Sequence, residues 1–66
     1  MNIVINGQQA DVPEGVTLLE LIEGRGLDPG VVVAELNLSI VPAEAFAHTR
    51  LSAGDSLELL HFVGGG

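Results

Sequence analysis

The sequence predicts an α+β domain in which one mixed sheet of about five strands packs one face against one main helix. Residues 2–5 alternate around Ile3 and Ile5, Asn6-Gly7 follows, and residues 8–12 return as a second strand. Asn-Gly is a strong hairpin signal, because a type I′ turn needs positive φ at both central positions. A short capped helix comes next, and further apolar segments of strand length follow it. A hairpin, a crossing helix and more strands are typical of a single sheet covered on one side.

The start of the helix is defined by a capping box. Thr17 can act as the N-cap, and Glu20 stands three residues later, where its side chain can reach back to the N-cap backbone. The apolar residues that share one helical face are Leu18, Leu21 and Ile22. Gly24 keeps the helix short, and we expect Gly26 to end it in the left-handed conformation.

The second half of the chain predicts the remaining strands. In order, its segments are a mostly buried strand over residues 31–36, a turn at 37–39, a very short strand at 40–41, one helical turn at 43–46 and a last strand over residues 56–62. We expect the last strand to lie centrally beside the first, so that the helix covers both.

The length and composition limit how such a domain can be stable. The 66 residues suffice for one domain and lie near the lower size limit for folding around one core. With no cysteine and two histidines, the chain lacks a disulfide framework, a thiol nucleophile and an evident metal site. Hydrophobic residues make up 47% of the chain, so stability must come from elements that bury them well.

The charge is strongly acidic, with nine Asp and Glu residues against Arg25 and Arg50. A net charge of −7 disfavours binding to nucleic acid or to anionic membranes. It suits docking on a basic protein surface, although it also serves simply to keep a small protein in solution. The sequence has no apolar run of membrane-spanning length and no signal-peptide pattern, so we expect a cytoplasmic protein that is monomeric when free.

Residues 63–66 read Val-Gly-Gly-Gly and follow the last strand directly. Glycine loses the most backbone freedom on ordering and has no side chain to bury, and chain ends are disordered unless something holds them. We therefore expect residues 1–62 to form the folded domain and residues 63–66 to form a flexible C-terminal glycine tail. An arm without Cβ atoms can enter a narrow cleft of a partner. A cloning remnant or a frayed end is the alternative for a bare glycine run.

The chemistry of such a tail is that of its terminal carboxylate. An α-carboxylate has a pKa near ~3.5, so it is ionised at neutral pH and is a poor electrophile. Adenylation by a partner enzyme would turn it into an acyl-adenylate, and a sulfur nucleophile could then displace AMP and leave a thiocarboxylate. The chain offers no evident base, metal site or nucleophile, so we expect it to be a protein co-substrate and not an enzyme.

With these features the whole chain resembles the ThiS family, the sulfur carriers of thiamine thiazole synthesis, which have a ubiquitin-like β-grasp fold. The matching segments are Asn6-Gly7, Thr17-Leu18-Leu19-Glu20-Leu21, Glu35-Leu36-Asn37, Ile40-Val41-Pro42, Leu51 with Gly54-Asp55, and His61-Phe62-Val63-Gly64-Gly65-Gly66. Leu38 stands where members often carry Gly or a charged residue, which affects the turn and not the tail chemistry.

The resemblance implies a set of partners and a modified residue. A ThiF-like activating enzyme, which consumes ATP, would adenylate Gly66, and a cysteine desulfurase or another donor would supply the sulfur. The thiocarboxylate on Gly66 would then deliver its sulfur to a ThiG-like thiazole synthase. Gly64 and Gly65 correspond to the arm that threads into these partners. No cofactor is expected to be bound by the carrier itself.

The last strand also suggests a docking surface. Leu60 and Phe62 share one strand face, and Leu57 and Leu59 share the other. Only one face can meet the helix, so the other would expose apolar groups beside the tail. We expect Leu60, Phe62 and the adjoining Val63 to form a partner-docking surface. The alternative is that Leu60 and Phe62 are ordinary core residues.

The remaining ionisable residues are interpreted as structural. His61 in a strand, and His48 more clearly, are more often packed or half-exposed residues than catalytic groups. Arg25 and Arg50 are expected to be solvated.

Three other functions stay open on these grounds. One is the related carrier for molybdopterin synthesis, which usually ends in Gly-Gly after a proline-containing approach. Another is a ubiquitin-like modifier joined to lysines of targets, although this chain has no lysine on which to build chains. A passive β-grasp interaction module, in which the glycine tail is dispensable, is the third.

Overall fold

The computed structural model describes residues 1–62, and the predicted tail at 63–66 lies outside the described residues. Over the described part the elements, in order, are β1 (Asn2–Ile5), β2 (Gln8–Asp11), α1 (Leu18–Gly24), the 3-10 helix η1 (Pro29–Val31), β3 (Val32–Leu36), β4 (Ser39–Val41), the 3-10 helix η2 (Ala43–His48) and β5 (Ser56–His61). None of the helices in this part is long and apolar enough to cross a membrane.

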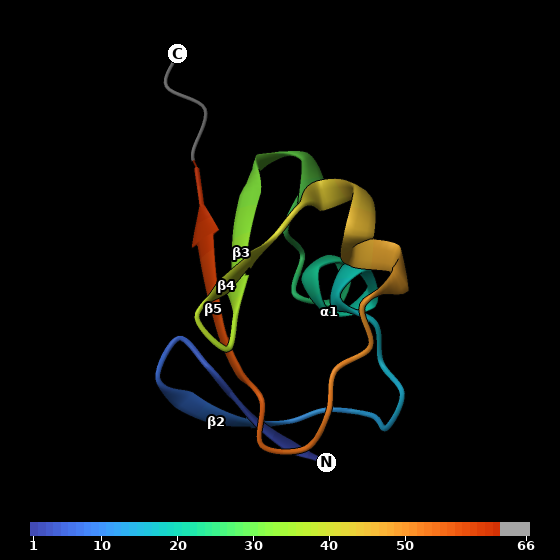
Figure 1. Ribbon diagram of the computed structural model, residues 1–66, viewed down its shortest axis with the longest axis vertical. Helices are drawn as coiled ribbons and strands as arrows, with labels where there is room; N and C mark the ends of the chain where they lie inside the picture. Colours follow the sequence, from blue (N-terminus) through green and yellow to red (C-terminus); the bar gives the residue numbers. More distant parts are fainter. Residues whose placement is uncertain (63–66) are drawn as a thin grey trace.

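The five strands form one mixed sheet with the order β2-β1-β5-β3-β4. β5 lies in the centre, where it runs parallel to β1 and antiparallel to β3. α1 lies over one face of this sheet, and η2 packs beside α1 on the same side (Figure 1). The predicted fold class, with one mixed sheet, one main helix on one face and the last strand beside the first, is confirmed.

Both tight hairpin turns use positive φ at two successive residues. In the β1–β2 turn, Asn6 has φ 50° and Gly7 has φ 81°, as the Asn-Gly pair predicts. In the β3–β4 turn, Asn37 has φ 50° and Leu38 has φ 73°. Positive φ is uncommon for leucine, and the side chain of Leu38 is 91% exposed, so it gains nothing from burial in return. The turn geometry is therefore imposed by the paired strands on either side.

The ends of α1 form as the sequence predicts. The Thr17 side chain accepts a hydrogen bond from the Glu20 N–H at 3.1 Å, and the Thr17 N–H donates to Glu20 Oε1 at 2.9 Å. At the other end Gly26 has φ 77°, its N–H donates to the Glu23 carbonyl, and the Leu27 N–H donates to the Ile22 carbonyl. This pair of bonds is the Schellman arrangement that satisfies carbonyls at the helix end.

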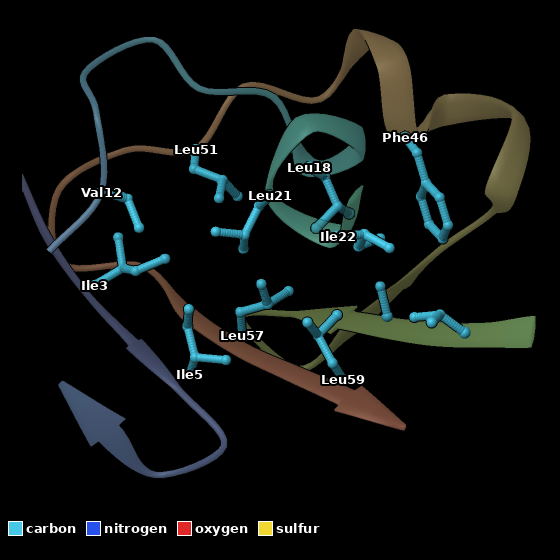
Figure 2. Packing of buried hydrophobic residues seen from close by; sticks show 12 residues of the cluster. Ile3, Ile5, Val12, Leu18, Leu21, Ile22, Phe46, Leu51, Leu57 and Leu59 are labelled. Atoms are coloured by element: carbon cyan, nitrogen blue, oxygen red, sulfur yellow. The ribbon is translucent and has the colours of Figure 1, made fainter. Parts of the chain in front are cut away.

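The core lies between α1 and the facing side of the sheet. Figure 2 shows the side chains of Leu18, Leu21 and Ile22 pointing from the helix toward Leu57 and Leu59. The twelve buried hydrophobic residues of this cluster are Ile3, Ile5, Val12, Leu18, Leu21, Ile22, Val32, Ala34, Phe46, Leu51, Leu57 and Leu59. In the absence of cysteine, this one cluster is the main source of stability.

The segment 31–36 differs from the prediction of a mostly buried strand. Val31 belongs to η1 and is 37% exposed, and β3 begins at Val32. Within β3 burial alternates, with Val32 and Ala34 buried and Val33 and Glu35 only half-buried. The reason is that the helix covers one face of the sheet only, so every second residue of β3 faces away from the core.

β5 should show this one-sided burial in its response to mutation. Leu57→Ala removes a fully buried side chain and should lower the free energy of unfolding by about 2–5 kcal/mol. Leu60→Ala, on the exposed face of the same strand, should lower it by less than about 1 kcal/mol. Urea unfolding of both variants measures the difference. Equal losses would contradict the assignment of the two faces.

Candidate functional site

The site predicted from the sequence begins where β5 ends. One residue beyond the end of β5, the Phe62 N–H donates to the carbonyl of Val31, the residue just before β3, at 3.0 Å. The residues expected to be modified or to thread into partners, Gly64, Gly65 and Gly66, lie outside the described residues, as does Val63. The structure therefore defines the base from which these four residues continue.

The two faces of β5 have opposite environments. Leu57 is 0% exposed and Leu59 is buried beneath α1, whereas Leu60 and Phe62 are each 58% exposed. The alternative in which Leu60 and Phe62 belong to the core is therefore wrong. Their exposure next to residues 63–66 is the arrangement that a docking surface requires, and the docking role itself stays a prediction. His61 is on the same face of β5 as the buried Leu57 and Leu59, but it lies at the end of the strand and is exposed.

Asn6 holds β5 in place near this end, a role that the sequence did not reveal. β1 ends at Ile5, and the Asn6 N–H donates to the Leu57 carbonyl at 2.9 Å. Asn6 Oδ1 then accepts a hydrogen bond from the Leu59 N–H at 2.8 Å, and Nδ2 donates to the Leu59 carbonyl at 3.4 Å. The amide thus takes the place of a strand backbone after β1 has ended. The sequence signal that could have indicated this role is the asparagine side chain itself, because its amide carries both a hydrogen-bond donor and an acceptor, as a backbone peptide group does.

The face of the sheet opposite α1, called the outer face below, carries more than Leu60 and Phe62. A shallow hollow of about 200 Å³ on it is lined by Val33, Glu35, Ile40, Glu58 and Leu60. Ile40, on β4, is 62% exposed. The register places Val33 opposite Leu60 and Glu35 opposite Glu58. Two carboxylates and several apolar side chains from three strands thus share one surface.

A second hollow, of about 660 Å³, lies on the helix side of the sheet, between α1 and the loop after β2. Arg50 reaches into this region, where its Nη1 donates to the Gly15 carbonyl at 2.6 Å. Arg50 is thus exposed but also holds the loop, which corrects the expectation of a merely solvated side chain. Hydrogen bonds from the backbone and side chain of Thr17 lower the pKa of Glu20 from its ordinary value of 4.5, and nearby Arg50 adds to the effect. These contacts give Arg50 and Glu20 structural roles at this hollow.

The described residues show no metal centre. Within residues 1–62 no three side chains of His, Cys, Asp or Glu come close enough together to hold a metal ion. His48 lies on η2 and His61 at the end of β5, and both are exposed.

Both the sequence and the fold of this chain are similar to those of known proteins. A family model described as the ThiS family matches residues 3–66. The chain belongs to the ThiS family. The structure is also similar to the crystal structure of the thiamine biosynthesis protein ThiS from Geobacter metallireducens, with a TM-score of 0.85, 35% identity and complete coverage of both chains. The mixed sheet and the main helix therefore have the β-grasp arrangement that the sequence predicts.

Two kinds of curated relatives match the chain. The sulfur carrier protein ThiS of Bacillus subtilis is 34% identical over 50 residues, which cover 76% of each protein. The thiazole synthase of Paramagnetospirillum magneticum is 38% identical over all 66 residues of the chain. The chain spans about a fifth of the length of this thiazole synthase and of a second one from Magnetococcus marinus. A ThiS-like segment thus occurs both in a small carrier protein and within longer thiazole synthases.

Proposed function

We propose that this chain is a sulfur carrier of thiamine biosynthesis, which carries sulfur as a thiocarboxylate on Gly66 and donates it for formation of the thiazole ring. The observation that supports this most is membership of the ThiS family over residues 3–66, a match that includes the terminal glycines. The exposed apolar residues at the end of β5 add physical support, because they flank the segment that partners must grip.

Two chemical steps would load the carrier. A carboxylate oxygen of Gly66 attacks the α-phosphorus of ATP, which forms an acyl-adenylate and releases pyrophosphate. Hydrosulfide then attacks the acyl carbon, the C–O bond to AMP breaks, and a thiocarboxylate remains with AMP as the leaving group. A persulfide donor would instead form an acyl disulfide, and a thiol would then have to attack its S–S bond to release the thiocarboxylate and leave a disulfide. ATP is consumed by a ThiF-like activating enzyme, and the sulfur comes from a cysteine desulfurase or another donor. This scheme requires Gly66 to carry the free carboxylate in the working form of the protein.

The acceptor of the sulfur is a ThiG-like thiazole synthase. Support comes from the relatives called thiazole synthases, which contain a segment similar to this entire chain. In such a scheme the carrier acts as a co-substrate, and the groups that catalyse adenylation, sulfur transfer and ring formation lie on its partners. Gly64 and Gly65 pass through narrow parts of these partners, where a Cβ atom would collide.

Removal of Gly65 and Gly66 tests this function. The truncated chain should support no thiazole formation in a mixture of ATP, sulfur donor, activating enzyme, thiazole synthase and the carbon and nitrogen substrates of the synthase, because the reactive acyl group would be missing. Its urea unfolding midpoint should equal that of the full chain, since the core residues of β5 are unchanged. Thiazole formation at the normal rate would show that the tail is dispensable and that the chain acts as a passive interaction module.

Phe62→Asp tests the docking surface separately from the tail chemistry. A charged side chain in place of this 58% exposed ring should slow adenylation of Gly66 by about tenfold or more, because the apolar contact with the activating enzyme is lost. Pyrophosphate release measures the rate. The matched control is Leu38→Asp, the same kind of change at a 91% exposed leucine beyond the far end of β3. Equal rates for Phe62→Asp and the unmutated chain would remove Phe62 from the docking surface.

A further inference from the structure

The outer face contains a pair of like charges that the fold itself does not need. Glu35 on β3 and Glu58 on β5 are register partners, so their side chains project from the same face at directly opposed positions. Like charges in this arrangement destabilise a sheet. Glu58 is exposed and Glu35 is half-buried, so neither is driven into position by a core contact.

No cation of the described residues compensates this pair. The ion pair found in residues 1–62 joins the Met1 amino group to Asp11. Arg25 and Arg50 both line the hollow between α1 and the loop after β2, on the helix side of the sheet. The two carboxylates are therefore placed where a positive charge from outside the described part of the chain would be attracted.

The surroundings of the pair indicate which cation fits. Glu35 and Glu58 belong to the hollow of about 200 Å³ whose other lining residues, Val33, Ile40 and Leu60, are apolar. Leu60 and Ile40 are 58% and 62% exposed, so their apolar surface is open to a partner. A long side chain with an apolar stem and a cationic end matches both features, because its stem can pack on the apolar residues while its end meets the carboxylates.

We propose that the thiazole synthase partner places an arginine side chain in this hollow, with its guanidinium group between Glu35 and Glu58. This inference rests on the proposed function, and it adds the chemistry of the contact. A guanidinium group has five N–H donors in a planar fork, so it can bond both carboxylates at once, which a lysine ammonium group does less well. The net charge of −7 favours the approach of a basic surface. Phe62, one residue beyond the end of β5, would contact the same partner beside the tail.

Charge-neutral variants of the carrier test the proposal. The dissociation constant of the full chain for the thiazole synthase of the same organism is measured by calorimetry for the unmutated chain, Glu35→Gln, Glu58→Gln and the double variant. Each single change should weaken binding by about tenfold and the double change by more, because the guanidinium group loses a charged acceptor. The urea unfolding midpoint of each variant should stay equal or rise, because the repulsion within the sheet is relieved. Weaker binding by a domain that is no less stable excludes misfolding as the cause.

The matched control is Glu44→Gln, which removes one negative charge from an exposed position on η2, away from the sheet. This variant should bind within about twofold of the unmutated chain, since distant exposed charges are largely screened. Equal weakening by Glu44→Gln would show a general effect of net charge and would overturn the proposal. Unchanged binding by Glu35→Gln and Glu58→Gln would overturn it as well and leave the proposed function intact. Failure of the unmutated chain to bind thiazole synthase would overturn both.

Discussion

The pairing of β5 with β1 on one side and β3 on the other is the interaction on which the rest of the molecule depends. β5 comes last in the described chain, yet it occupies the centre of the sheet, so the sheet is continuous only when it is in place. Leu57 and Leu59 carry its inner face into the core beneath α1. Because side chains alternate along a strand, the same placement turns Glu58 and Leu60 outward. The buried core and the composition of the outer face therefore both depend on the placement of β5.

Two asparagines from hairpin turns hold β5 near its ends. Asn6, in the β1–β2 turn, bonds both backbone groups of Leu59 through its side chain. Asn37, in the β3–β4 turn, accepts a hydrogen bond from the Ser56 N–H at 2.9 Å and donates one to the Asp55 carboxylate at 3.0 Å. Both residues have φ 50°, which asparagine tolerates better than most residues. In a domain of 66 residues without disulfides, such contacts keep the central strand in register where strand pairing alone has ended.

Local signals in the sequence were enough to predict the first half of the fold. The Asn6-Gly7 turn and the Thr17–Glu20 capping box each depend on residues close together in the chain, and both form as expected. The burial of residues 31–36 was predicted wrongly, because a mostly apolar segment does not show that only one face of its sheet is covered. The pairing of Glu35 with Glu58 could not be predicted, since it depends on the register between strands that are distant in the sequence. For Gly64–Gly66, by contrast, the chemical hypothesis came from the sequence alone, because these residues lie outside the described part of the structure.

The claim that Gly66 is the working residue of a ThiS-family carrier is tested most directly by the intact mass of the protein. The chain is incubated with ATP, its activating enzyme and a sulfur donor, and its mass is compared with that of the untreated chain. The result expected is an increase equal to the exchange of one oxygen atom for one sulfur atom, located on Gly66 by fragmentation. An unchanged mass, under conditions in which the same enzymes convert an established ThiS protein, would contradict the claim.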